Sequence, residues 1–233
     1  MTNGDARSAI RGQTIDGGNE RCPLCGADGA SLFHRDARRE YFRCSVCSLV
    51  FVPGRGQVSA ADEKRHYDQH ENDPADLRYR AFLSRLSAPL VPRLRPGDSG
   101  LDFGCGPGPT LSVMLAEAGF SMALYDPIYA PDPAVFSATY DFITASEVIE
   151  HFREPGFELE RLRRLIRPGG WLALMTKRVL NAEAFAKWHY ITDPTHVSFF
   201  SDETFRWIAG QWNAKLELVG PDVALLQMRA AAK

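Results

Sequence analysis

The feature that most constrains the fold is the run LDFGCGPGP at residues 101–109. Residues 101–103 have the character of a short strand, and they lead directly into a turn with glycine at alternate positions. Residues 110–118 have the apolar spacing of a helix, which Gly119 ends. Alternating glycines let a backbone approach a ligand where any Cβ would clash. The run therefore predicts a strand, a ligand-binding turn and a helix in direct succession.

Strands and helices continue to alternate downstream of this turn. We expect strands at residues 122–125, 140–145 and 171–176 and a helix at 154–166. This alternation implies an α/β fold whose parallel sheet has helices on both faces. The last two expected strands, 215–219 and 223–228, are separated by only three residues. Since so short a link cannot make a parallel crossover, the sheet should end in an antiparallel hairpin.

Four of the five cysteines form two C-x-x-C pairs, Cys22 with Cys25 and Cys44 with Cys47. Two such pairs complete the tetrahedral thiolate set typical of structural zinc, which leaves no open position for catalysis. Two disulfides are disfavoured because nothing in the sequence indicates secretion. The fifth, Cys105, lies in the glycine turn, where we expect a small buried side chain. The pattern predicts a zinc ribbon that needs its metal to fold.

These features divide the chain into four parts. We predict a flexible tail at 1–19, a four-cysteine zinc ribbon at 20–54, a linker and N-terminal helix at 55–97, and a cofactor-binding domain at 98–233. The helix in the third part is expected at about 74–94, where leucines recur at helical spacing.

The overall charge excludes several classes of protein. The 27 Lys and Arg residues against 29 Asp and Glu give a net charge of −2, so nucleic-acid binding through bulk charge is not expected. The apolar content of 45% excludes wholesale disorder. We see no apolar stretch of membrane-spanning length and no secretory signal, so we expect a cytoplasmic protein without membrane contact.

The glycine turn by itself is compatible with a dinucleotide site. However, its spacing is G-x-G-x-G rather than G-x-G-x-x-G, and Asp102 precedes the first glycine by two residues. A carboxylate there suits a ligand with an ammonium group better than one with a pyrophosphate. Together with Asp126 and the segment RPGGW at 167–171, the turn resembles class I S-adenosylmethionine-dependent methyltransferases over about residues 62–233.

This resemblance implies a Rossmann-like, doubly wound sheet of seven strands with a terminal antiparallel strand. It also implies that the three glycines border the methionine part of S-adenosylmethionine, that Asp126 binds the ribose and that Asp102 acts on the amino end, directly or through water. The full set of predicted cofactor-binding residues is Asp102, Gly104, Gly106, Gly108, Asp126, Pro127, Ser146 and Glu147. Only 14 residues separate Asp126 from Asp141, so the family's third strand barely fits and the acid for adenine has no clear counterpart.

A polar and aromatic loop at residues 188–200 follows the strand expected to end at Thr176. Ligands of open α/β sheets lie at the carboxyl ends of strands, so this loop should face the acceptor. Its motif D-x-T-H-V-x-F-F resembles segments of a broad methyltransferase group. The candidate catalytic residues are His196, His189, Tyr190 and Asp193. We predict that His196 is the base; the alternative is a histidine that only holds the loop.

The segment Glu147-Val148-Ile149-Glu150-His151 resembles the metal-binding segment of the ubiquinone-pathway O-methyltransferases. It either binds a second metal or has a structural or substrate-positioning role. Further upstream, His66, Tyr67 and His70 either close over the cofactor or form a solvated helix face.

The favoured function is methyl transfer to a small molecule. The alternative is an RNA methyltransferase, because a four-cysteine ribbon ahead of this fold resembles the ribosomal-RNA guanine methyltransferases. A dehydrogenase-like or non-catalytic binding module is a third possibility. The sequence leaves open the acceptor and the oligomeric state.

Overall fold

The computed structural model describes residues 20–68 and 73–230, so the predicted tail at 1–19 and His70 lie outside the described residues. Its central sheet has the strand order β5-β4-β6-β7-β10-β9. The first four of these strands are parallel, and β10 runs antiparallel to both β7 and β9. The strands are β4 (Ser99–Phe103), β5 (Ser121–Tyr125), β6 (Tyr140–Ser146), β7 (Ile166–Met175), β9 (Lys215–Val219) and β10 (Val223–Gln227). The predicted terminal hairpin is thus present.

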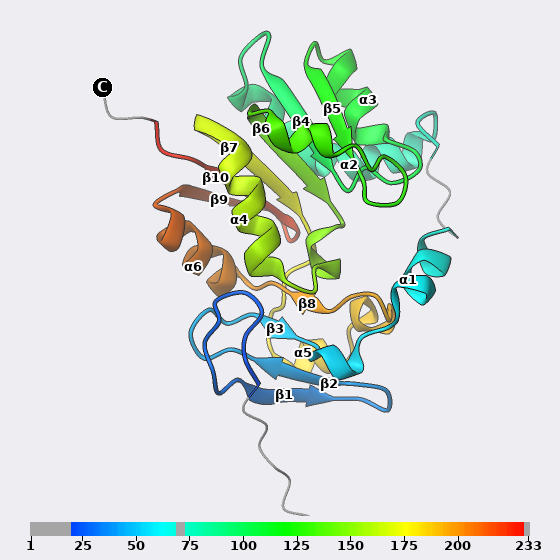
Figure 1. Ribbon diagram of the computed structural model, residues 1–233, viewed down its shortest axis with the longest axis vertical. Coiled ribbons are helices and arrows are strands. Elements are labelled where there is room, and N and C mark those ends of the chain that lie inside the picture. The colour runs from blue at the N-terminus through cyan, green and yellow to red at the C-terminus, as the bar shows by residue number, and fades with distance from the viewer. Residues whose placement is uncertain (1–19, 69–72, 231–233) are drawn as a thin grey trace, which may run out of the picture.

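Helices cover both faces of this sheet (Figure 1). On one face, leucines of α2 (Leu77–Leu90) and α3 (Thr110–Glu117) pack against Phe142 and Trp171 of the sheet. On the other, α4 (Pro155–Leu165) and α6 (Asp202–Trp212) bury their apolar stripes in the larger core. Two short helices, α1 (Ala60–Tyr67) and α5 (Ala182–Ala186), complete the set. None of the helices in residues 20–68 and 73–230 is long and apolar enough to cross a membrane.

The predicted class, a Rossmann-like α/β fold with an antiparallel end, is confirmed, but the described sheet has six strands where seven were expected. The difference lies between β5 and β6. A single short 3-10 helix, Pro133–Ser137, occupies this connection, and Asp132 caps it by accepting a hydrogen bond from Ala134 N at 2.9 Å. A strand with its crossover helix needs more residues than this interval offers.

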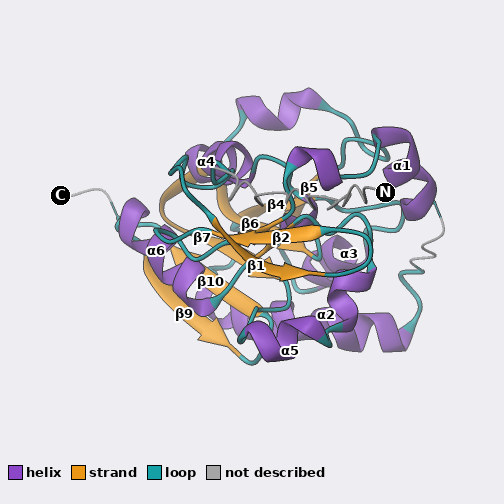
Figure 2. Ribbon diagram, turned by 90° about the horizontal axis from the view of Figure 1, so that it is seen from below, coloured by secondary structure: helices purple, strands orange, loops and turns teal. Residues whose placement is uncertain are grey.

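The ribbon builds a second, antiparallel sheet in the order β1-β2-β3-β8. Its strands are β1 (Ser31–Arg35), β2 (Glu40–Arg43), β3 (Val50–Phe51) and β8 (Ser198–Phe199). The last strand comes from the loop after β7, so the ribbon sheet continues into the downstream domain. Figures 1 and 2 show β1 and β2 stacked below the central sheet. A cluster of buried aromatic rings that includes Tyr41, Phe185 and Phe199 joins the two parts.

Candidate active site and metal centre

The glycine loop leaves the carboxyl end of β4 and opens α3, as predicted. Gly104 and Gly106 have φ angles of 74° and 65°, which side chains other than glycine rarely adopt. A Cβ on Gly104 would also lie 2.5 Å from Cγ2 of Val148. Gly104 N donates to the carbonyl of Tyr125 at 2.7 Å, which ties the loop to β5. The loop conformation therefore depends on glycine at both positions.

Asp102 is buried beneath this loop, with 3% of its surface exposed. Its Oδ2 accepts from Ser112 Oγ and its Oδ1 from Thr144 Oγ1, both at 2.8 Å. Burial raises the pKa of Asp102, and the two hydroxyl hydrogen bonds oppose that shift. The two hydroxyls fix the carboxylate without neutralising it, so a cationic ligand group would be favoured nearby.

Asp126 lies at the end of β5 and is also buried. Its carboxylate accepts three backbone hydrogen bonds, from Gly106 N at 3.1 Å, Ile128 N at 2.8 Å and Tyr129 N at 3.0 Å. A carboxylate offers about four acceptor sites, so roughly one remains for a ribose hydroxyl. The contact to Gly106 joins the predicted ribose acid to the glycine loop, and Pro127 is exposed beside it.

The end of β6 carries polar atoms that have no partner within the described protein. Ser146 Oγ and Glu147 Oε1 are buried and make no hydrogen bond there. Glu147 has a φ of 53°, an uncommon conformation for a side chain other than glycine. Burial raises the pKa of Glu147 to about 7. Because the next residue, Val148, packs against Gly104, this polar edge borders the glycine loop.

A second buried group forms around the hydroxyl of Tyr190. This hydroxyl donates to Glu150 Oε1 and lies 3.1 Å from Thr176 Oγ1 and 3.4 Å from Glu147 Oε2. Glu150 is fully buried, and its Oε2 has no hydrogen-bond partner among the described residues. Burial and the charge of Glu147 raise the pKa of Glu150 to about 8. The two carboxyl groups can therefore hold a proton at neutral pH.

The structure brings three of the four candidate catalytic residues together. His196 is buried, and its Nδ1 lies 2.8 Å from the carbonyl oxygen of Tyr190. Since a carbonyl can only accept, Nδ1 carries the proton, and Nε2 is the basic nitrogen of the neutral ring. Nε2 lies 3.6 Å from Oδ2 of Asp193. The fourth candidate, His189, is exposed, with Nε2 2.8 Å from Lys177 Nζ.

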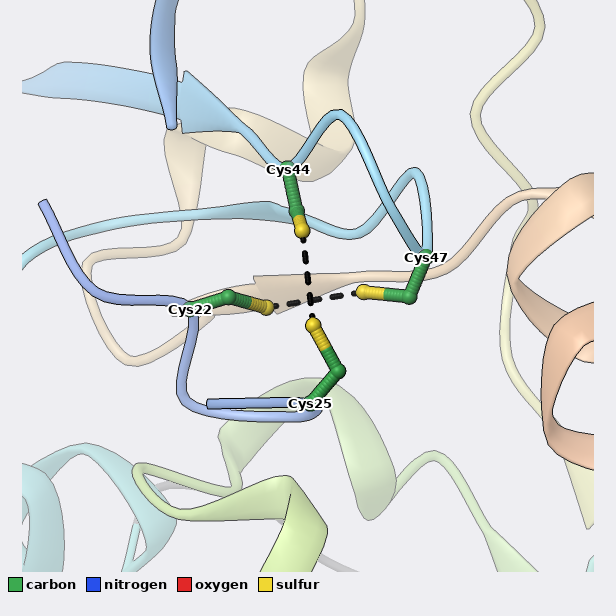
Figure 3. Close-up of side chains that lie close together, drawn as sticks. All are labelled: Cys22, Cys25, Cys44 and Cys47. Carbon is green, nitrogen blue, oxygen red and sulfur yellow. Dashed lines mark hydrogen bonds between the residues drawn. The ribbon is translucent and has the colours of Figure 1, made fainter. Parts of the chain in front are cut away.

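The four predicted metal ligands converge on one point (Figure 3). The sulfurs of Cys22 and Cys47 are 3.5 Å apart, as are those of Cys25 and Cys44. Tetrahedral bonds of about 2.3 Å to zinc place sulfurs about 3.8 Å apart, so the set fits this ion. No disulfide is present in residues 20–68 and 73–230, and Cys105 lies apart in the glycine loop. The donor set is that of a closed structural site.

Residues 64–219 match the family model of a methyltransferase domain, which covers more than half of the 233 residues. The chain belongs to this methyltransferase family. This family agrees with the resemblance to class I S-adenosylmethionine-dependent methyltransferases that the motifs indicated.

Two curated proteins are similar to this methyltransferase over 164 residues. The biotin biosynthesis bifunctional protein of Bordetella avium is 30% identical, with 60% of this chain and 33% of that protein covered. An uncharacterized 37.1 kDa protein in a transposon of Streptomyces fradiae is 28% identical, with coverage of 59% and 46%. The similar region thus spans between a third and a half of the length of these relatives.

Solved structures of other methyltransferases are also similar. Magnesium protoporphyrin IX methyltransferase from Synechocystis, with bound SAH, has a TM-score of 0.48 and 18% identity, with 73% of this chain and 94% of that chain covered. An O-methyltransferase family protein from Burkholderia thailandensis has a TM-score of 0.47 and 16% identity, with coverage of 73% and 64%.

The methyltransferase contains a second group of possible metal ligands, and it differs from the predicted one. Ligand atoms of Glu150, His151 and His196 all lie within 4.8 Å of one another. The predicted set was Glu147, Glu150 and His151, so His196 replaces Glu147 as the third possible ligand. The rings of His151 and His196 meet edge to face with centroids 4.7 Å apart.

Three contributions to the site escaped the sequence analysis. Thr144 and Ser112 hold Asp102, and Thr176 contacts Tyr190. The guanidinium of Arg39, in the ribbon, binds the loop that carries His196. No motif marks these residues. The only signal in the sequence was the inward-facing position of Thr144 in β6 and of Ser112 in α3.

The predicted closing segment partly reaches the site. The ring of Tyr67, at the end of α1, lies 5.2 Å from that of His151. Asp68 accepts a hydrogen bond from the Tyr129 hydroxyl at 2.8 Å. The side chain of His66 is outside the described residues. The end of α1 therefore bridges the Tyr190 group and the Asp126 turn.

Proposed function

We propose that this methyltransferase transfers a methyl group from S-adenosylmethionine to a small-molecule acceptor. The observation that carries the proposal is the position of two buried polar groups at one edge of the sheet. One surrounds the glycine loop with Asp102 and Asp126, and the other surrounds Tyr190, Glu150 and His196. Glu147 and Val148 lie between the two and contact both.

The first group would hold the cofactor. The glycine loop offers backbone without side chains, Asp102 a carboxylate for the amino end, and Asp126 an acceptor for the ribose. Ser146 Oγ and Glu147 Oε1, which lack partners among the described residues, are available to a ligand. S-adenosylmethionine supplies an electrophilic methyl group when it is bound. Transfer is an in-line displacement, so the main task of the protein is to align the acceptor.

The second group would orient and deprotonate the acceptor. His196 has its Nδ1 proton directed at the Tyr190 carbonyl, which leaves Nε2 as the nitrogen that can accept a proton. Asp193, 3.6 Å away, would stabilise the resulting imidazolium. Tyr190 and Glu150 would bind polar groups of the acceptor through their hydroxyl and carboxyl. His189, on the surface beside Lys177, would contact an acceptor only at the entrance.

We propose that the four cysteines bind a structural zinc ion. The convergence of four sulfurs from two turns supports this assignment. Four thiolates complete the coordination of zinc, so the ion would hold the ribbon together and take no part in transfer.

Burial of the protein residues proposed to bind the acceptor favours a small molecule over RNA. His196 and Tyr190 are less than a tenth exposed, which suits a ligand that can be enclosed. The ribbon arginines also have partners within the protein. Arg55 pairs with Glu20 and Glu40, and Arg35 pairs with Glu40. Arg39 binds the loop that carries His196. Fewer positive charges then remain for phosphates.

Calorimetry with S-adenosylhomocysteine tests the cofactor assignment. We expect binding by the wild-type protein and at least about a tenfold loss in Asp126→Ala, since the ribose acceptor is removed. Asp98→Ala removes a half-buried carboxylate before β4, which accepts from Arg95 N at 2.9 Å away from the glycine loop, and is the matched control. Binding of NADH in place of S-adenosylhomocysteine would refute the proposal.

A salt series tests the acceptor class. RNA binding whose affinity falls steeply with rising salt would favour the RNA alternative, because phosphate contacts release counterions. Weak binding without a steep slope, together with release of S-adenosylhomocysteine in a screen of small hydroxyl and amine compounds, would support the small-molecule acceptor.

A further inference from the structure

The acceptor loop, residues 190–197, is held by a side chain from the zinc ribbon. Arg39 lies directly before β2 and is 7% exposed. Its Nη1 donates to the carbonyls of Pro194 and His196, both at 2.9 Å. Its Nη2 donates to the carbonyls of Ile191 at 2.8 Å and Asp193 at 3.0 Å. One guanidinium therefore binds four carbonyls of a loop more than 150 residues away.

These contacts use the full donor capacity of arginine. A guanidinium has five N–H groups, and the fifth, on Nε, lies 3.2 Å from the hydroxyl of Tyr41. That hydroxyl donates in turn to Asp36 Oδ2 at 2.9 Å. Lysine could satisfy at most three of the five partners. The shape of arginine thus matches the curvature of this loop, and no salt bridge to residues 20–68 or 73–230 explains the burial of Arg39.

Two further contacts fix the ribbon, one against the end of this loop and one against the start of α4. Val52 N donates to the carbonyl of Val197 at 2.9 Å, where β3 pairs with β8. On the first cysteine turn, the carbonyl of Pro23 accepts from Gly156 N at 3.2 Å. A Cβ on Gly156 would lie 2.4 Å from the carbonyl oxygen of Leu24, so this turn packs closely on the start of α4.

We propose that the metal-held ribbon is the support of the acceptor loop and that Arg39 is the residue that positions His196. The inference rests on the proposed function. Acceptor binding then depends on the ribbon, whereas cofactor binding does not. Arg39 contacts the carbonyl of His196 and those of its neighbours, and it touches no reacting group; its role is positioning.

The two aspartates of the cofactor group have no comparable dependence. Among the described residues, the partners of Asp102 and Asp126 all lie between Gly106 and Thr144. None of these residues belongs to the ribbon. Loss of ribbon order should therefore disturb the loop around His196 and leave the glycine loop intact.

Amide hydrogen exchange on the full chain tests the proposal. Val197 N, which donates to the Glu150 carbonyl at 2.8 Å, reports the loop. In Arg39→Ala we expect exchange at residues 190–197 to accelerate by roughly 10- to 100-fold, because four carbonyls, two of them buried, lose their donor. The exchange rate in Arg39→Lys should lie between those of the wild type and Arg39→Ala. Added methylguanidine should slow exchange again in Arg39→Ala.

Two neighbouring arginines serve as matched controls. Arg38 is more exposed and donates only to Thr192 and Ile191 carbonyls, so Arg38→Ala should accelerate loop exchange only a few-fold. Arg35 pairs with Glu40 on the surface and does not touch the loop. Arg35→Ala should leave loop exchange unchanged.

Metal removal provides a second measurement if Arg39→Ala fails to fold. A zinc chelator should accelerate exchange at 190–197, while the affinity for S-adenosylhomocysteine stays within about threefold. Unchanged loop exchange in Arg39→Ala, or loss of loop and cofactor binding together after chelation, would overturn the proposal. If S-adenosylhomocysteine does not bind even the wild-type protein, the proposed function fails, while the exchange result still decides the role of Arg39.

Discussion

The cofactor edge and the acceptor loop meet at the same edge of the sheet, but different kinds of contact hold them. Near Asp102, Gly104 and Asp126, the hydrogen bonds join neighbouring strands and one turn. Around His196, a contact from Glu150 to the loop backbone is joined by contacts from Arg39 and β3, at the other end of the chain. The first region is a property of the Rossmann-like sheet, and the second is also contacted by the small four-cysteine module.

This difference separates the two binding steps physically. In the proposed function, cofactor binding uses the glycine turn and two nearby carboxylates, all of which lie at the carboxyl edge of the parallel sheet. Acceptor binding, as proposed, uses a loop in which four carbonyls would lose their donor without Arg39. A change to the ribbon should therefore affect the acceptor step alone, and a change to the glycine loop should affect the cofactor step alone.

The largest effect is expected when the metal centre is destroyed. In Cys22→Ser/Cys25→Ser, zinc content should fall from one ion per chain to none, and the melting temperature should fall by roughly 10 °C or more. Metal analysis and thermal unfolding provide the measurements. Cys105→Ser is the control, because its sulfur is outside the four-cysteine set and zinc should be retained. Equal zinc content in both variants would contradict the ribbon assignment.

The glycine loop is the corresponding target on the cofactor side. Gly104→Ala combines a φ of 74° with a clash at 2.5 Å from Val148, so affinity for S-adenosylhomocysteine should fall by about 100-fold or more. Calorimetry measures this loss, and exchange at Val197 should not change. Gly97→Ala isolates the backbone strain, since Gly97 has a φ of 88° with open space around it. If the two variants bind equally well, the close approach at Gly104 is unimportant.

Prediction from sequence succeeded where structure is local. The strand, glycine turn and helix at 101–117 and the terminal hairpin follow from periodicity and turn residues over short windows. The missing seventh strand could be anticipated, because the interval before Asp141 was too short to hold it. The four predicted cysteine ligands also converge because their positions are set locally, by two short C-x-x-C turns.

The acceptor side was less predictable because long-range contacts build it. No pattern in the sequence pairs β3 with β8 or directs Arg39 to the Pro194 and His196 carbonyls. The left-handed backbone of Glu147 also leaves no signal, since glycine is absent there. The motif singled out His196 as the base, but nothing in the sequence indicated that the loop would bury His196 and turn His189 outward.

A pH series examines the buried carboxyl pair. The pKa of Glu150, about 8, is raised above its unfolded value of 4.5, so the folded state binds more protons between these limits. Stability is then full below about pH 4.5 and is lost as pH rises toward 8. From pH 5 to 8 the free energy of unfolding should fall by roughly 2–4 kcal/mol more in wild type than in Glu150→Gln.

Denaturant unfolding at each pH measures this difference. Glu183→Gln removes an exposed carboxyl and should reproduce the wild-type slope. A slope in Glu150→Gln as steep as that of the wild type would mean that Glu150 ionises normally in the folded protein.

The smallest effect concerns the hydroxyl that fixes Asp102. Thr144→Val keeps the shape of the side chain but removes the hydrogen bond at 2.8 Å to Oδ1, so the free energy of unfolding should fall by about 1–2 kcal/mol. If Asp102 binds the amino end of the cofactor, affinity for S-adenosylhomocysteine should also fall by about 3- to 10-fold. Ser112→Ala removes the hydrogen bond to Oδ2, and the double variant measures their coupling. Lower stability with unchanged affinity would give Asp102 a purely structural role, and the amino end would then need another acceptor.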